Sequence, residues 1–195
     1  MMSPEIIVIG ASYGGLSALQ IILPALAKDF PVPVVVVQHR GKDLDNLCEF
    51  LQKRSALPLT EPNDKDAIAP GRVYLAPRDY HLLVERDGFA LSTEGPVGYA
   101  RPSVNVLFES AADVYQAHVV GVVLTGANTD GARGLAKIKS YGGMCLAEDP
   151  ASAVSGGMPA AAIAATKVDA VLPLSEIAPF LNQLCQPESV SSYAS

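Results

Sequence analysis

Short apolar runs alternate with amphipathic stretches along most of the chain. Ile6–Ile9, Val34–Gln38 and Val119–Leu124 consist mainly of β-branched or aliphatic residues, as in strands that are buried on both faces of a sheet. After the first run, Leu16–Leu26 has apolar residues near helical spacing, which predicts a helix. This alternation predicts a doubly wound, three-layer α/β/α sandwich with a mostly parallel sheet.

The same pattern continues through the rest of the chain. Further strands are predicted over Gly71–Ala76, Met144–Ala147 and Val168–Leu172. Further helices are predicted over Asp43–Arg54, from an N-cap at Ser103 to Val114, over Ala132–Tyr141, after Pro159, and from a cap at Ser175 to Leu184.

The middle of the chain departs from this alternation. His81–Glu85 and Phe89–Ser92 flank the dipeptide Asp87-Gly88, which is a strong signal for a β-hairpin. We expect this hairpin to add antiparallel strands to the otherwise parallel sheet. The polar stretch Pro58–Pro70 is predicted to be a surface loop, in which a short edge strand is one option.

Length and composition indicate one globular unit. The chain has 195 residues, of which 49% are hydrophobic and 17% are charged. These values are typical of a compact, soluble protein with a single core. We place the domain at residues 1–185 and expect residues 186–195 to form a flexible tail.

Charge and cysteine content argue against several functional classes. The net charge of −6, without any run of Lys or Arg, argues against a nucleic-acid partner. No apolar run approaches the roughly 20 residues that cross a bilayer, and Met1–Glu5 lacks the basic start of a signal peptide. Cys48, Cys145 and Cys185 are odd in number and widely spaced, which fits neither a disulfide framework nor a metal site. We therefore expect a cytoplasmic protein without membrane insertion or a bound metal.

Ser12 occupies the turn Gly10–Gly15, between the first predicted strand and the first predicted helix. Its hydroxyl is expected near free backbone N–H groups and the positive end of a helix dipole, where negative charge is stabilised. Two alternatives compete: a serine that only caps the helix, and a phosphate-binding turn. The glycine order of this turn differs from G-x-G-x-x-G, and no Gly-Lys-Ser/Thr follows.

Three side chains come just after predicted parallel strands and are therefore expected at one edge of the sheet. They are Ser12, His39 and Asp130. In such folds ligands bind beyond the carboxyl ends of the strands. A hydroxyl, an imidazole and a carboxylate are the nucleophile, general base and orienting group of acyl transfer. Their chain order differs from that of the known triads, but geometry and roles define a triad.

Other residues compete for two of these roles. His81 begins a predicted antiparallel strand and His118 precedes a parallel strand, so each is expected to be structural or solvated. Asp149 also follows a predicted strand and is an alternative to Asp130 as the orienting carboxylate.

The chain resembles the catalytic domain of the chemotaxis protein-glutamate methylesterases, the CheB family, from Ile6 to about Leu181. The matching motifs are Gly10–Gly15, Gln38-His39, Ala100–Phe108, Leu124–Gly126, Asp130–Gly134 and Gly157–Pro159. The resemblance implies that Ser12 is the nucleophile, His39 the base and Asp130, rather than Asp149, the orienting carboxylate. It also implies hydrolysis of glutamate γ-methyl esters on the cytoplasmic helices of chemoreceptors, with deamidation of certain glutamines as a related activity. No cofactor is implied.

The chain departs from the family pattern at two places near these residues. Tyr13 stands where the family usually has Thr, and Gly126-Ala127-Asn128 replaces the usual Gly-Met-Gly. We expect backbone N–H groups near Tyr13 and Ala127 to hold the oxyanion. Arg101 is a candidate for contacting an acidic substrate segment, with a structural salt bridge as the alternative.

The family usually carries a phosphorylatable receiver domain before the catalytic domain, whereas this sequence begins almost at its first predicted strand. We therefore expect activity without a phosphodonor, with a separate receiver or signalling protein as a possible partner. Two other functions stay open at this point. One is a triad esterase or amidase that acts on a small molecule, and the other is a non-catalytic signalling module of the same fold.

Overall fold

The computed structural model describes residues 3–40 and 46–186. Within these residues the chain forms a seven-stranded sheet in the order β3-β4-β2-β1-β7-β8-β9, and every neighbouring pair is parallel. From one edge to the other the strands are β3 (Leu59–Thr60), β4 (Val73–Leu75), β2 (Val34–Gln38), β1 (Ile6–Ala11), β7 (Val119–Val123), β8 (Met144–Glu148) and β9 (Ala170–Leu172).

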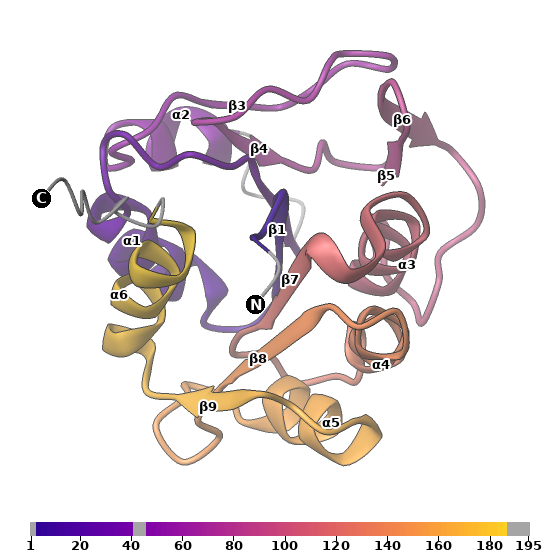
Figure 1. Cartoon of the computed structure of the whole chain (residues 1–195). Coiled ribbons are helices and arrows are strands. Elements are labelled where there is room, and N and C mark those ends of the chain that lie inside the picture. The colour runs from indigo at the N-terminus through magenta and orange to yellow at the C-terminus, as the bar shows by residue number, and fades with distance from the viewer. Residues whose placement is uncertain (1–2, 41–45, 187–195) are drawn as a thin grey trace, which may run out of the picture.

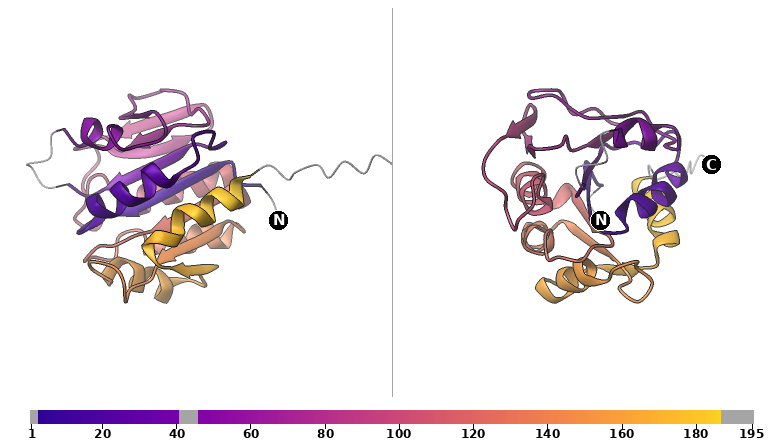
Figure 2. Two further views of the ribbon diagram at one scale, coloured as in Figure 1. Left: turned by 90° about the vertical axis from the view of Figure 1, so that its left-hand side faces the viewer. Right: turned by 180° about the vertical axis from the view of Figure 1, so that it is seen from behind.

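Helices cover both faces of this sheet, as the doubly wound prediction requires (Figure 1). One face carries α1 (Gly15–Ala25), α2 (Leu47–Gln52) and α6 (Leu174–Cys185). The other face carries α3 (Val104–Tyr115), α4 (Ala132–Ser140) and α5 (Gly157–Ala165), with a short 3₁₀ turn at Gln116–His118. The view in Figure 2 (left) shows α1 and α6 in front of the strands, on the first face.

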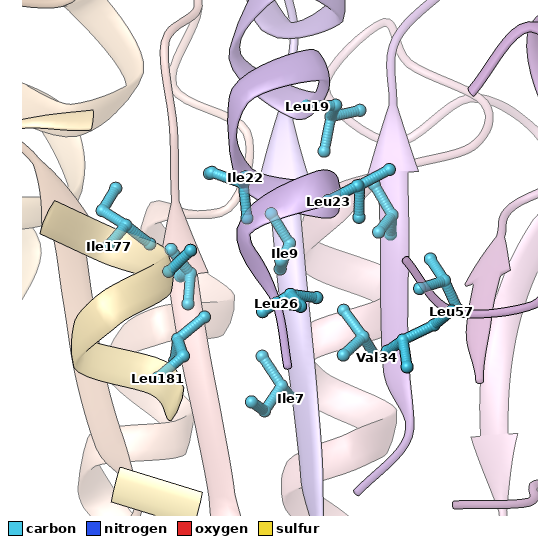
Figure 3. Close-up of a cluster of buried hydrophobic side chains, with 14 of the residues drawn as sticks. Ile7, Ile9, Leu19, Ile22, Leu23, Leu26, Val34, Leu57, Ile177 and Leu181 are labelled. Carbon is cyan, nitrogen blue, oxygen red and sulfur yellow. The ribbon is translucent and has the colours of Figure 1, made fainter. Parts of the chain in front are cut away.

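The central strand contributes to both halves of the core. Ile7 and Ile9 of β1 pack with Ile22 of α1 and Ile177 of α6 (Figure 3), whereas Val8 faces the opposite helix layer. All five side chains are completely buried. Burial of each such side chain stabilises the fold by about 1.5–3 kcal/mol. An uninterrupted apolar strand is therefore the expected sequence at this position.

The strand order creates a switch in winding direction at β1. From β1 the chain moves to β2 and β4 on one side, and it later returns to place β7 on the other side. The connections after β1 and β7 consequently leave toward opposite faces, to α1 on one side and α4 on the other. In folds of this kind ligands bind at the carboxyl ends of the strands where the winding reverses, which here are the ends of β1 and β7.

The predicted hairpin forms, but it does not extend the parallel sheet. β5 (His81–Glu85) and β6 (Gly88–Ser92) pair only with each other, in a separate two-stranded sheet. The position beyond β4 is taken by β3, which confirms the edge strand considered for the polar loop. The hairpin instead packs its apolar face, including Leu82 and Phe89, into the core beside α3.

One predicted helix start is wrong in detail. α6 begins at Leu174, directly after Pro173, so Ser175 lies inside the helix and does not cap it. α2 begins at Leu47 and ends at Gln52; the predicted start at positions 43–45 lies outside the described residues, as do tail residues 187–195. None of the helices in residues 3–40 and 46–186 has the length and apolar character needed to span a membrane.

Candidate active site

Ser12, His39 and Asp130 follow three adjacent strands. Ser12 comes directly after β1 and His39 directly after β2, while Asp130 lies in the loop between β7 and α4. Backbone hydrogen bonds continue the sheet into these segments: Ser12 N donates to Thr125 O at 2.9 Å, and His39 N donates to Ala11 O at 3.0 Å. The parallel register therefore brings all three residues to one edge of the sheet.

His39 and Asp130 are in direct contact. Nε2 of His39 lies 2.9 Å from Oδ2 of Asp130, and the side chains are 14% and 1% exposed. A carboxylate can only accept, so the neutral ring places its proton on Nε2. Nδ1 is then the ring atom that can accept a proton from another group.

Asp130 also caps helix α3, a role that the sequence predicted for Ser103. The backbone N–H groups of Val104 and Asn105 donate to the Asp130 carboxylate at 2.7 and 3.0 Å. Ser103 does occupy the N-cap position, but its hydroxyl donates to Asp130 Oδ1 at 2.9 Å and makes no side-chain cap bond. The carboxylate therefore sits at the positive end of the α3 dipole.

These contacts decide the charge state of Asp130. Burial by itself would raise the pKa of this carboxyl, since it disfavours the ionised form. The hydrogen bonds from His39, Asn105, Val104 and Ser103 outweigh that penalty and hold the pKa of Asp130 below its usual value. The group is thus negatively charged at neutral pH, and it holds the His39 ring in one orientation.

Asn128 lies against the other side of the imidazole, which sequence reasoning did not anticipate. Its Oδ1 accepts the Asp130 N–H at 3.0 Å, which turns its Nδ2 toward His39 Nδ1 at 3.3 Å. The available signal was an Asn two residues before an Asp in a loop, because such residues often bond to the backbone two positions on. In the resting protein, Asn128 therefore partners the nitrogen that is free of Asp130.

Ser12 does not cap α1. The helix begins at Gly15, and its N-cap position is Gly14, with a φ of 84° that favours glycine. Among residues 3–40 and 46–186, the Ser12 hydroxyl has no hydrogen-bond partner. The structure thus places this hydroxyl at the carboxyl end of β1 without a hydrogen bond that holds it to the described part of the fold.

The loop after β7 packs directly against the nucleophile turn. A Cβ added to Gly126 would lie 2.9 Å from Ser12 Cβ and would overlap Met158 Sδ, so only glycine fits there. Thr125 Oγ1 donates to Tyr13 O at 2.8 Å, which joins the two loops. Neither the Tyr13 N–H nor the Ala127 N–H donates to another described residue.

The remaining predicted site residues are placed differently. Tyr13 is 68% exposed, and the next residue, Gly14, lies against the exposed Val154. Arg101 Nη1 donates to Thr93 O at 2.8 Å and to Glu94 O at 3.0 Å, so the side chain holds a surface loop. The alternative of a structural salt bridge at Arg101 is wrong within the described part of the chain.

The competing residues lie away from the Ser12 hydroxyl or in structural roles. His81 is buried, with Nδ1 accepting the Ser103 N–H at 3.2 Å and Nε2 lying 3.1 Å from Gly95 O. His118 lies at the amino end of the sheet, with Nδ1 3.0 Å from Ser3 O. Asp149 accepts the Ala151 N–H at 2.9 Å within its own turn.

Glu148 is a second buried carboxyl beside the site, and the sequence did not predict it. Glu148 ends β8, and its Oε2 accepts the Thr125 N–H at 2.8 Å. Burial is the main cause that raises the pKa of this carboxyl. In the sequence Glu148 is only a polar residue after an apolar strand. That pattern did not indicate that its side chain turns toward the loop that contacts Ser12.

Comparison with known proteins identifies relatives along almost the whole chain. The chain is 46% identical over 187 residues to a putative protein-glutamate methylesterase/protein-glutamine glutaminase of Leptospira interrogans, covering 95% of this chain and 97% of the relative. It is 39% identical over 188 residues to the protein-glutamate methylesterase/protein-glutamine glutaminase of Thermotoga maritima. That match covers 94% of this chain but 55% of the Thermotoga protein.

A solved structure agrees with the fold described above. The crystal structure of the Thermotoga maritima CheB methylesterase catalytic domain superposes with a TM-score of 0.88 at 38% sequence identity, over 94% of this chain and 100% of that one. The family model for CheB methylesterase matches residues 7–181, which include every residue of the site. The chain therefore belongs to the CheB methylesterase family.

Proposed function

We propose that this protein is a serine hydrolase that cleaves glutamate γ-methyl esters on the cytoplasmic helices of chemoreceptors. As a related activity it deamidates receptor glutamines. The observation that carries the proposal is the 2.9 Å contact between His39 Nε2 and Asp130 Oδ2, at the sheet edge where Ser12 presents an untied hydroxyl. Family membership supplies the substrate class, because the Leptospira and Thermotoga relatives are named for these two activities.

The reaction begins with attack on the ester carbonyl carbon. Ser12 Oγ forms a bond to that carbon while His39 Nδ1 takes the hydroxyl proton. Nδ1 is the base because Asp130 occupies Nε2. Asn128 must give way for this step, since its Nδ2 lies 3.3 Å from the same nitrogen. Catalytic hydrogen bonds of this kind often form only once the substrate is bound.

Hydrogen-bond donors must then stabilise the negative charge that develops on the carbonyl oxygen. The Tyr13 and Ala127 N–H groups are available within the described structure and lie on the two loops that flank Ser12. Loss of one donor of this type usually lowers kcat by about 10²–10³. Replacement of the usual Met by Ala127 keeps the backbone donor and removes only a side chain.

Three further proton transfers complete the turnover. The proton on His39 Nδ1 passes to the methoxide oxygen, the bond from that oxygen to the carbonyl carbon breaks, and methanol leaves. His39 then takes a proton from water, whose oxygen attacks the Ser12 ester. When that intermediate collapses, His39 returns the proton to Ser12 Oγ, and the product leaves as a glutamic acid side chain whose carboxyl proton passes to water.

The surroundings of Ser12 favour a side chain presented on a protein surface. Tyr13, which follows it in the chain, is largely exposed, as are Val154 beside Gly14 and Ala127 in the loop after β7. An open rim of this kind suits a glutamyl ester on a receptor helix in the cytoplasm better than a small enclosed metabolite.

Methanol release from a methylated receptor cytoplasmic fragment tests the proposal. We expect the wild-type protein to release methanol with a higher kcat/KM than it shows for a small aryl ester. The Ser12→Ala variant is the matched control. Efficient cleavage of the aryl ester with no methanol from the receptor fragment would reject the receptor assignment and favour a small-molecule esterase. Absence of both activities would favour a non-catalytic signalling module.

A further inference from the structure

Gln38 is the last residue of β2, directly before His39, and its side chain is buried, with the residue 4% exposed. Its Nε2 group donates one hydrogen bond to Ser12 O at 2.9 Å and one to His39 O at 2.7 Å. Both acceptors are carbonyls, so this orientation of the amide is the one that satisfies them. A single NH₂ group therefore links the backbone of Ser12 to the backbone of His39.

This link lies where the sheet no longer holds the two segments together. The last strand-like bond between them is His39 N to Ala11 O at 3.0 Å. Beyond it, the side chains of Ser12 and His39 make no hydrogen bond to each other in the described structure. Their separation thus depends on where their backbones lie, and the Gln38 amide is bonded to both.

The amide oxygen of Gln38, Oε1, indicates that fold stability alone does not explain why glutamine stands at this position. Gln38 Oε1 is buried and, among residues 3–40 and 46–186, has no hydrogen-bond partner. An unpaired buried carbonyl destabilises a folded protein. The start of α1 also makes room for it, because a Cβ on Gly15 would overlap Oε1. The fold thus carries an unfavourable group whose partner NH₂ spans the two reacting residues.

We infer that Gln38 is a positioning residue, which fixes the distance between the Ser12 hydroxyl and the His39 ring. The inference rests on the proposed function of Ser12 and His39 as nucleophile and base. Proton transfer between them requires near-ideal separation, and a misplacement of about 1 Å can lower the rate about 100-fold. Gln38 acts through the two backbones and touches neither the substrate nor the transferred proton.

The variant Gln38→Met removes both hydrogen bonds and keeps the length of the side chain. Ser12 O keeps the bond from Gly15 N at 2.8 Å, and the unpaired Oε1 disappears together with the amide. We therefore expect a melting temperature close to that of the wild type. The rate of Ser12 labelling by a fluorophosphonate and kcat for methanol release should both fall about 10- to 100-fold, with KM nearly unchanged.

Gln52→Met is the matched control. The Gln52 amide also bonds to two backbone groups, Leu59 N at 2.6 Å and Leu57 O at 3.4 Å, but it joins α2 to β3 away from the site. This variant should lose thermal stability and keep the wild-type labelling rate and kcat. A merely structural role for Gln38 predicts the same behaviour for Gln38→Met.

A second variant, Gln38→Glu, keeps the shape of the side chain but has no N–H to donate to either carbonyl. It should show the same loss of labelling rate as Gln38→Met. Wild-type labelling rates in either variant would overturn the inference. Rapid labelling of the wild type without methanol release from the receptor would reject the substrate assignment alone, and the comparison of labelling rates would still decide the role of Gln38.

Discussion

The two ends of the candidate triad are held in opposite ways. Asp130 is almost completely buried, and its carboxylate accepts hydrogen bonds from His39, Ser103, Val104 and Asn105. The Ser12 hydroxyl, at the other end, has no hydrogen-bond partner within the described residues. The carboxylate is part of the architecture of α3, whereas the nucleophile is carried by a glycine-rich turn.

This difference separates what must be fixed from what must move. A charge that stabilises the protonated imidazole works best when it is already oriented, because no reorganisation is then needed during the reaction. The hydroxyl must leave its resting position to attack a carbonyl carbon. A side chain without structural contacts can do so without weakening the fold. The comparison therefore predicts that substitutions at the two ends differ in their effects on stability even where both reduce activity.

The largest effect on activity is expected at Ser12. Ser12→Ala should lower kcat for methanol release by roughly 10⁴–10⁶, as loss of a nucleophile does in other triads. Its melting temperature should stay close to the wild-type value, because the hydroxyl has no partner to lose. Turnover assays and calorimetry on one preparation measure both quantities. A marked drop in stability would contradict the description of Ser12 as structurally untied.

Asp130→Asn should reduce both activity and stability. The amide cannot accept the His39 Nε2–H and the bonds from α3 equally well, so the ring loses its fixed tautomer and kcat falls up to about 10⁴. Asp149→Asn is the control, since among the described residues the Asp149 side chain bonds only within its own turn. Equal losses of kcat in the two variants would contradict the assignment of Asp130.

Acid should destabilise the protein through the same carboxylate. The pKa of Asp130 is lower in the folded state than its usual value of about 3.9. Its contribution to stability is therefore fully present above that value and is lost as the pH falls through the lower, folded pKa. Melting temperatures from pH 6 down to pH 3 should fall more steeply for the wild type than for Asp130→Asn. Parallel curves would show that Asp130 contributes nothing to acid sensitivity.

Ser103→Ala should have an intermediate effect. It removes one of the hydrogen bonds to the Asp130 carboxylate and leaves the two backbone donors of α3 in place. We expect a loss of about 1 kcal/mol in the free energy of unfolding and a decrease in kcat of about tenfold or less. Denaturant titration and steady-state kinetics measure the two. A kcat loss as large as that of Asp130→Asn would show that the backbone donors alone do not hold the carboxylate.

The smallest effect is expected at Tyr13, on the open side of the site. Tyr13→Thr should leave the fold intact, because the side chain is 68% exposed and its carbonyl, not its ring, binds Thr125. We expect turnover to stay equal or rise by a few-fold and bulkier acyl groups to be accepted, since the ring narrows the rim beside Ser12. Relative kcat/KM values for methyl and bulkier esters test this. Loss of all activity would mean that the ring contacts the substrate.

Much of this arrangement could be predicted from the sequence, for reasons that are physical. Apolar runs such as Ile6–Ile9 indicate buried parallel strands, and the residues that follow such strands must meet at one edge of the sheet. That reasoning placed Ser12, His39 and Asp130 at one edge of the sheet; in the structure they follow adjacent strands there, and His39 contacts Asp130. Residue spacing alone did not choose between Asp130 and Asp149, and the family resemblance was needed.

The features that escaped prediction depend on contacts between distant segments. Nothing local shows that Asp130 caps a helix which begins 26 residues earlier, and Ser103 was the better local candidate. The contact of Asn128 with the imidazole and the turn of Glu148 toward Thr125 are likewise set by tertiary packing. The hairpin was predicted correctly as a hairpin, but its docking against α3 depends on β3 occupying the sheet edge.

The central claim is that Ser12 is a nucleophile activated by His39. The most direct test is the site and rate of covalent labelling by a fluorophosphonate, read by mass spectrometry of the digested protein. We predict a single adduct on the peptide that contains Ser12, with labelling at least about 100-fold slower in His39→Gln and unchanged in His118→Gln. An adduct on another residue, or rapid labelling of Ser12 in His39→Gln, would contradict the account.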